Sequence, residues 1–209
     1  MKQRILLRAL CVSNLLGFCV SVPAAVPASW IEVEGYQVDM TLAPKSREAE
    51  TLANLRHQIR IIDAARPPGP VRDFFRTVRI VIDPSLAGMN GQYVPGEDGW
   101  VVRARPGRWP RDRAILLHEF LHAYQQQVLG QPTPPVGRAF QEAQRAGTYP
   151  RGYKDAYFLS NAREYFAVVA EIYLAGPSFR PPYNCRNVQK AQPDFIRYLA
   201  TLFGERECR

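Results

Sequence analysis

The chain has 209 residues, 46% of them hydrophobic, and carries a formal charge of +8, which indicates one globular domain with at most small additions and excludes a largely disordered chain. The arginines are spread along the sequence, as at positions 103, 105, 108, 111 and 113, and we find no basic cluster interleaved with aromatic residues and no nucleic-acid-binding motif. We therefore predict a solvated basic surface and no nucleic-acid partner, with weak attraction to anionic envelope surfaces as the alternative use of the charge.

The first residues have the order of a secretory signal: a basic start, a mostly apolar run, and small residues in "VPAAVPA". We predict cleavage after one of three alanines, Ala24, Ala25 or Ala28, and treat residues 1–28 as a signal peptide. The mature protein is then exported, to a periplasm or out of the cell. A retained membrane anchor is the alternative, but the apolar run is shorter than the ~20 residues that a spanning helix needs, so we expect no stable membrane insertion.

Removal of the signal peptide changes the charge and the cysteine count. The formal charge falls from +8 to +5, because residues 1–28 carry three basic groups and no acidic group. The cysteines fall from four to two, Cys185 and Cys208. Two cysteines in an exported chain usually pair, so we predict a disulfide that closes a C-terminal loop and stabilises the fold by about 3 kcal/mol.

The elements predicted in the first half of the chain are a strand (30–40), a helix (46–65), a strand (77–83) and two short strands within "QYV" and "GWVVRARP". Ser46 can cap the helix, and "RPPGP" breaks it. The turn-rich "PGEDG" joins the last two strands.

Helices dominate the predicted second half. The first can be capped by Asp112 and ended by Gly130, and "QPTPP" follows as a linker. The others are a short helix (138–147), a strong helix (161–175) stopped by Gly176-Pro177, and an amphipathic C-terminal helix (192–204). This order of elements predicts an α+β domain, over residues 29–209, with a small twisted mixed sheet.

The helix after Asp112 contains "ILLHEFLHAY", residues 115–124. His118 and His122 are four residues apart, so on a helix they lie on one face, about 5–6 Å apart between Cβ atoms. Two imidazoles placed in this way can bind one tetrahedral metal, while Glu119 points to the side of that face, beside a water held by the metal. HExxH on a helix is the signature of a zinc metallopeptidase with the glutamate as general base.

The surroundings of this motif favour a buried site. Glu119 is the only charged residue between Ala114 and Gly130, and apolar residues cover most of the predicted helix surface. A buried carboxylate without a partner is unfavourable, and a zinc site with its water supplies that partner. The alternative is a chance HExxH, which we expect on the order of once in a few hundred chains of this length.

Catalytic zinc sites use three protein ligands, and no third histidine is suitable. His57 lies in the first helix between Arg56 and Gln58, which are expected to be exposed, and it is interpreted as an ordinary surface histidine. No H-x-x-G-x-x-H extension follows His122, which excludes the metzincins, so a carboxylate must complete the site.

Among the downstream acids, only Glu164 and Glu171 lie in a helix that is apolar nearly all round. Glu164 is nearer the start of that helix and is the predicted third ligand. The alternative for Glu164 is a capping box with Asn161. Glu171 either holds the second ring nitrogen of a histidine ligand or faces solvent; the pattern leaves both open.

With "HEFLH" followed some forty residues later by "YFLSNAREYFA", the chain resembles the metallopeptidase family of the anthrax lethal factor catalytic domain and the secreted Pro-Pro endopeptidases. The resemblance covers roughly residues 75–176, with weaker agreement back to about residue 36. It implies a zincin-like fold in which a second helix carries the glutamate ligand, here Glu164. It also implies that Tyr157, seven residues before that glutamate, donates a hydrogen bond to the oxyanion of the reaction.

Two departures from this family stand out. Its members often have an acid four residues after the third ligand, where this chain has Val168, so the support of the histidines falls to Glu171 or another group. The large toxin domains around the lethal factor catalytic unit are absent from this sequence, so toxin-like targets are not implied.

The sequence therefore predicts an exported zinc metallopeptidase of the Glu-zincin type that acts on a peptide or protein substrate. His118, His122 and Glu164 are the predicted zinc ligands, and Glu119 and Tyr157 the catalytic residues. By resemblance, the strand within "GWVVRARP" is expected to offer its edge to an extended substrate. Two alternatives stay open: a non-catalytic zinc-binding module that holds a protein partner, and a zinc hydrolase of a non-peptide amide such as a cell-wall bond.

Overall fold

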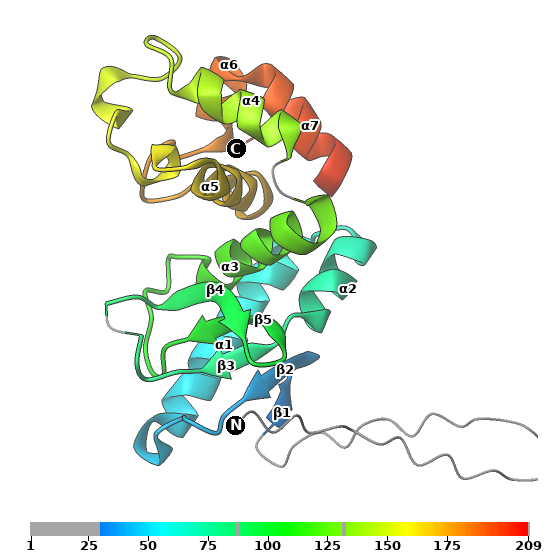
Figure 1. The fold of residues 1–209 in the computed structure, drawn as a ribbon, viewed down its shortest axis with the longest axis vertical. Helices are drawn as coiled ribbons and strands as arrows, with labels where there is room; N and C mark the ends of the chain where they lie inside the picture. Colours follow the sequence, from blue (N-terminus) through cyan, green and yellow to red (C-terminus); the bar gives the residue numbers. More distant parts are fainter. Residues whose placement is uncertain (1–29, 87, 131–132, 209) are drawn as a thin grey trace, which may run out of the picture.

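The computed structural model describes residues 30–86, 88–130 and 133–208, and the predicted signal peptide lies outside them. The described residues form one five-stranded mixed sheet and seven α-helices, which confirms the predicted α+β class (Figure 1). The strands are β1 (Trp30–Val33), β2 (Tyr36–Asp39), β3 (Ile80–Ile82), β4 (Gly91–Gly96) and β5 (Gly99–Ala104). The helices are α1 (Glu48–Ala65), α2 (Gly69–Thr77), α3 (Ile115–Tyr124), α4 (Pro134–Ala143), α5 (Ala162–Ala175), α6 (Cys185–Ala191) and α7 (Pro193–Phe203).

The sheet has the strand order β1-β2-β3-β5-β4. The inner strands β2, β3 and β5 are parallel, and the two outer strands β1 and β4 pair antiparallel to their neighbours. Val38, Ile80 and Val102 lie side by side in register and are fully buried, so one face of the sheet is apolar. Tyr36 on this face stacks on Phe120 of α3, with ring centroids 5.5 Å apart, so α3 packs directly on the sheet.

In Figure 1, α3 lies between the sheet and a second group of helices, α4–α7. The apolar residues of α5 are buried because α5 contacts α3 on one side and α4, α6 and α7 on the other. The predicted disulfide is present: Cys185 at the start of α6 and Cys208 near the C-terminus are bonded, with Cα atoms 4.9 Å apart. This bond joins the C-terminal tail to the helical group that holds α5 in place.

The predicted strand over 30–40 is wrong in one respect, because it is a hairpin of β1 and β2. Glu34 and Gly35 have φ angles of 51° and 85°, and these two left-handed residues reverse the chain. A two-residue turn of this kind matches the twist of the flanking strands and needs positive φ at both central positions. Gly35 favours such a turn, but apolar and polar residues alternate on both sides of it, so the sequence pattern alone reads as one continuous strand.

Helix α2 was not predicted. "RPPGP" ends α1 as expected, but Gly69 and Pro70 then occupy the first turn of α2. Proline is tolerated there because a backbone N–H in the first turn has no partner within the helix. The predicted strand over 77–83 therefore shortens to β3. The start of α1 also differs: a short 3-10 turn, η1 (Lys45–Arg47), precedes it, and Ser46 makes no capping hydrogen bond.

The start of α3 corrects a further prediction, because Asp112 does not cap it. Gln58 of α1 takes that role: its Oε1 accepts from Leu116 N–H at 3.2 Å, and its Nε2 donates to the Arg113 carbonyl at 2.9 Å. Gln58 is buried rather than exposed as expected, because both polar atoms of its amide bond the start of α3. Helix α1 thus fixes the beginning of the HExxH helix through a contact 58 residues away in sequence.

The end of the α3 segment is confirmed at Gly130, which has a φ of 75° and follows a π-helical turn, η2 (Gln125–Leu129). The short helix predicted over 138–147 forms instead as α4, since Pro134 and Pro135 open it. Among the helices of the described residues, none combines the length and apolar character that crossing a membrane requires.

Candidate metal centre

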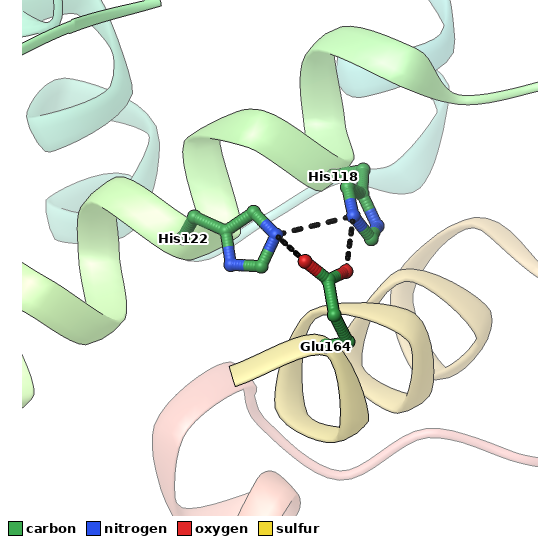
Figure 2. A group of neighbouring side chains, drawn as sticks. All are labelled: His118, His122 and Glu164. Carbon is green, nitrogen blue, oxygen red and sulfur yellow. Dashed lines mark hydrogen bonds and ion pairs between the residues drawn. The ribbon is translucent and has the colours of Figure 1, made fainter. Parts of the chain in front are cut away.

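Helix α3 presents the two histidines of the motif to α5. His118 and His122 are one helical turn apart and buried, with 6% and 5% of their surfaces exposed. Glu164, in the first turn of α5, reaches both of them. Figure 2 shows the three side chains pointing toward one another, two from α3 and one from α5.

The separations of the donor atoms fit a tetrahedral metal. The Nε2 atoms of His118 and His122 are 3.2 Å apart. The Glu164 carboxylate lies 3.1 Å from His118 Nε2 and 3.4 Å from His122 Nε2. With metal–ligand distances of about 2.0–2.2 Å, two donors on a tetrahedron lie about 3.3–3.6 Å apart. The three side chains could therefore hold one metal ion with little movement.

Glu171 lies behind this cluster rather than facing solvent. Its Oε2 is 3.1 Å from His118 Nδ1, and 13% of its side chain is exposed. A carboxylate at this nitrogen holds the proton there and leaves Nε2 bare to bind a metal. His122 Nδ1 has no hydrogen-bond partner among the described residues.

Asn161 caps α5, and Glu164 still reaches the histidines. The Asn161 side chain accepts hydrogen bonds from the N–H groups of Arg163 and Glu164, each at 3.0 Å. The Glu164 carboxylate is directed away from the cap, so the reciprocal half of a capping box is not formed among the described contacts. The cap fixes the first turn of α5 and so fixes where Glu164 begins.

The protonation of the cluster follows from its burial and its hydrogen bonds. Burial disfavours the charged imidazolium of His118, but hydrogen bonds with Glu164 and Glu171 outweigh this and raise the pKa of His118 to about 9. Burial also disfavours the Glu164 carboxylate, yet hydrogen bonds with His118 and His122 hold the pKa of Glu164 well below its usual range. A metal that binds Nε2 of His118 must displace the imidazolium proton that faces Glu164, while the proton on Nδ1 stays beside Glu171.

Glu119 leaves the metal-facing side of α3 and meets the edge of the sheet. Its Oε2 accepts a hydrogen bond from the backbone N–H of Tyr93 in β4 at 2.9 Å. Gly91 allows this approach, since a Cβ there would lie 3.1 Å from both Glu119 Cγ and Ile115 Cγ2. Glu119 has 8% of its surface exposed and lines the cleft beside the cluster.

Tyr157 lines the same cleft and belongs to the 3-10 turn η4 (Tyr157–Leu159). Its ring centroid is 6.3 Å from that of His118, and 47% of the residue is exposed. Burial of the hydroxyl and its hydrogen bond with Glu164 raise the pKa of Tyr157 above the ordinary phenol value. The hydroxyl therefore stays protonated at neutral pH and can donate.

Two adjoining hollows make up the cleft, and Met89, Gly91, Glu119 and Tyr157 line both of them. The first, of about 530 Å³, contains His122 and Glu164, and the second, of about 250 Å³, contains His118 and Glu171. A larger hollow of about 810 Å³ lies between α4 and the following loop, but none of the cluster residues lines it. The chemistry of the donor set, rather than size, identifies the cleft as the candidate site.

The strand expected to offer its edge to a substrate is the wrong one. β5, formed by "GWVVRA", lies inside the sheet between β3 and β4. β4 is the edge strand, and Gly91, Gln92 and Tyr93 of β4 line the cleft. Pairing partners cannot be read from one strand's own pattern, because order in a sheet depends on the whole chain.

Several cleft residues were not singled out from the sequence. They are Met89, Gly91, Gln92, Tyr93, Arg113, Arg163, Phe179 and Arg180. Gly91 carried a usable signal, since glycine within a strand often marks a close approach. His57 stays outside the site, as predicted; its Nε2 is 2.9 Å from the Arg111 carbonyl oxygen.

Comparison of this chain with protein-family profiles, with curated proteins and with solved structures finds no match.

Proposed function

We propose that this protein is an exported zinc metallopeptidase with a zincin-like fold, related to the lethal factor and Pro-Pro endopeptidase family. One observation carries the proposal: a buried carboxylate, Glu119, lies beside a group of two histidines and a glutamate whose donor atoms are spaced for a tetrahedral metal. Zinc is the metal that such a His, His, Glu set most often holds in hydrolases. The secretory pattern of residues 1–28 and the disulfide support export.

The catalytic steps follow from the positions of the side chains. When bound, zinc polarises the scissile carbonyl and lowers the pKa of its water. Glu119 accepts a proton from the attacking water and later delivers it to the leaving amine. Tyr157, which lines the cleft with the cluster and is protonated at neutral pH, donates a hydrogen bond to the oxygen of the scissile carbonyl as negative charge develops on it.

The edge strand β4 gives an extended peptide a place to bind. Successive residues of a strand direct their backbone groups to opposite sides, and the N–H of Tyr93 points away from β5, toward Glu119. Gly91 therefore presents its backbone groups to the same free edge, close to the base. A peptide laid along this edge has its scissile carbonyl near the cluster.

The Glu119 carboxylate separates this proposal from the first alternative, the non-catalytic zinc-binding module. A module that only holds zinc and a protein partner has no use for a buried, oriented Glu119, whose burial costs stability unless it is partnered. A hydrolase of cell-wall amides needs the same zinc, base and oxyanion donor, so only substrate tests distinguish it. The extended free edge of β4 favours a peptide.

The test combines zinc analysis with digestion of a random peptide library. The purified protein is expected to hold one zinc per chain, Glu164→Ala to hold little, and the surface control Glu48→Ala to hold as much as the wild type. Glu119→Gln is expected to keep zinc and to lose about 10²–10⁴-fold in cleavage rate. A folded, zinc-loaded wild type that cleaves no peptide would refute peptidase activity, and digestion of purified wall material then tests the amidase alternative.

A further inference from the structure

One end of the cleft is closed by the segment between α5 and α6, residues 176–184, which we call the strap. Its backbone is held by its own hydrogen bonds: Ser178 N–H donates to the Tyr183 carbonyl at 2.6 Å, and Tyr183 N–H donates to the Arg180 carbonyl at 2.9 Å. Asn187 of α6 also donates to the Pro182 carbonyl at 2.8 Å. The strap continues into the disulfide-bonded Cys185, so its position is fixed at that end.

Two arginines, one from the strap and one from the segment before α3, line the same hollow of the cleft. Arg113 precedes α3, and its guanidinium carbon lies 4.0 Å from the ring centroid of Phe179. The guanidinium carbon of Arg180 lies 5.7 Å from the same ring and 4.5 Å from the ring of Tyr157. Guanidinium groups that stack on aromatic faces keep the N–H donors at their edges available. The stacking therefore holds both cations at the cleft without using their donors.

These donors have few partners in the protein. Arg113 forms no ion pair within the described residues, and Arg180 has Glu171 as its one acid there, at 3.9 Å. That carboxylate is nearer to His118, at 3.1 Å. The Nε of Arg180 is buried without a hydrogen-bond partner among the described residues. An unpartnered buried donor is unfavourable, so a ligand that accepts from it is stabilised.

The backbone at Arg113 is also fixed before any ligand binds. Its carbonyl accepts from Gln58 of α1 at 2.9 Å, so the base of this side chain does not shift freely. The hollow of about 250 Å³ that the two arginines line is also lined by His118, Glu119 and Tyr157. A group held by the arginines therefore lies next to the reacting atoms.

We propose that Arg113 and Arg180 form a carboxylate-binding subsite at the strap end of the cleft, and that the enzyme selects peptides with an acidic group there. Planar guanidinium groups bind carboxylates through paired hydrogen bonds, which suits two arginines that converge on one hollow. The carboxylate belongs either to an Asp or Glu side chain or to the C-terminus of the peptide. As a statement about substrate choice, this inference rests on the proposed peptidase function.

Binding is tested without relying on turnover. Three amino-acid probes are titrated into the purified protein: acetyl-Glu-amide with a side-chain carboxylate, acetyl-Gln with a terminal carboxylate, and acetyl-Gln-amide with neither. The arginine Nε–Hε NMR signals of Arg113 and Arg180 report contact. We expect these signals to move with one or both carboxylates, and the affinity for that probe to fall about tenfold in Arg113→Gln.

Arg111→Gln is the matched control, because Arg111 is on the same loop but lines a different hollow with His57 and Trp109. It is expected to bind the probes as the wild type does. Equal responses to the neutral probe and the carboxylates, or full affinity in Arg113→Gln, would overturn the subsite.

Peptide-library digestion then tests substrate choice. Acidic groups should be enriched at one fixed position relative to the cleaved bond, and Arg113→Glu should replace that preference with one for lysine. Cleavage without any acidic preference refutes the subsite and leaves the peptidase function standing. Carboxylate binding seen by NMR in a protein that cleaves no peptide supports the subsite and refutes the peptidase function.

Discussion

The backbone N–H of Tyr93 donates to Glu119 Oε2 at 2.9 Å, so the edge strand of the sheet orients the carboxylate that we propose as the general base. Strand β4 thus has two functions in the proposed mechanism. It holds the carboxylate, and its free edge is the place where we propose that an extended substrate binds.

Gly91→Ala tests this contact. The added Cβ would lie 3.1 Å from Glu119 Cγ and so displaces the carboxylate or the strand. Because small misplacements of a catalytic group are costly, we expect kcat/KM to fall about 10²-fold with zinc content unchanged. Gly137→Ala in α4 is the control: a Cβ there meets no heavy atom within 4 Å, and the variant should be as active and about 1 kcal/mol more stable. Full activity of Gly91→Ala would show that Glu119 needs no such space.

Tyr157→Phe removes the proposed oxyanion donor and leaves the ring stacked under Arg180. We expect kcat to fall about 10²–10³-fold, with zinc content and KM little changed, because the hydrogen bond strengthens only in the transition state. Steady-state kinetics on a cleaved peptide measure this, with Tyr198→Phe on the distant helix α7 as control. An unchanged kcat would return Tyr157 to a packing role.

Glu171→Gln tests the group behind His118. A neutral amide at this position, 3.1 Å from His118 Nδ1, favours the tautomer that leaves Nε2 bare less strongly than a carboxylate does, so zinc affinity should fall about 10–100-fold. Competition with a chromogenic chelator measures the affinity, and Glu205→Gln on the exposed C-terminal tail should leave it unchanged. If Glu171→Gln binds zinc as tightly as the wild type, Glu171 does not support the metal.

Gln58→Ala should destabilise the fold, since it leaves the Arg113 carbonyl and the Leu116 N–H without their partner at the start of α3. The expected loss in the free energy of unfolding is about 1–3 kcal/mol, measured by urea denaturation. Arg60→Ala, on the exposed side of the same helix, should change it by less than about 0.5 kcal/mol. A loss no greater than that of Arg60→Ala would mean that α3 begins without help from α1.

Tyr36 predicts a change in stability at alkaline pH. Burial raises the pKa of Tyr36 to about 12, above its unfolded value of 10.0. The folded state therefore keeps the phenol proton more tightly than the unfolded state, and the free energy of unfolding falls as the pH rises from 10 toward 12. Tyr36→Phe should therefore lose less stability than the wild type between pH 8 and pH 11. At pH 8 the variant should be about 1 kcal/mol more stable, because the hydroxyl is buried without a partner among the described residues. Parallel slopes with pH would contradict this assignment.

The sequence alone determined the parts of the site that depend on local geometry. The spacing of His118 and His122 places both on one helical face, because an α-helix repeats every 3.6 residues. Glu164 stood out as a carboxylate in an apolar helix, since burial of a charge requires a partner. The disulfide followed from the count of cysteines left after the signal segment.

Only the tertiary structure decided what reaches the site from distant segments. The order of strands makes β4 the edge, and its backbone N–H at Tyr93 carries no side-chain signature that a pattern could reveal. Gln58 replaces Asp112 as the cap of α3 because α1 packs against that end. Arg113 and Arg180 both contact the ring of Phe179 because the fold brings the start of α3 beside the segment after α5. Such contacts depend on how the chain folds back on itself, and hydrophobic periodicity records only which face of each element is buried.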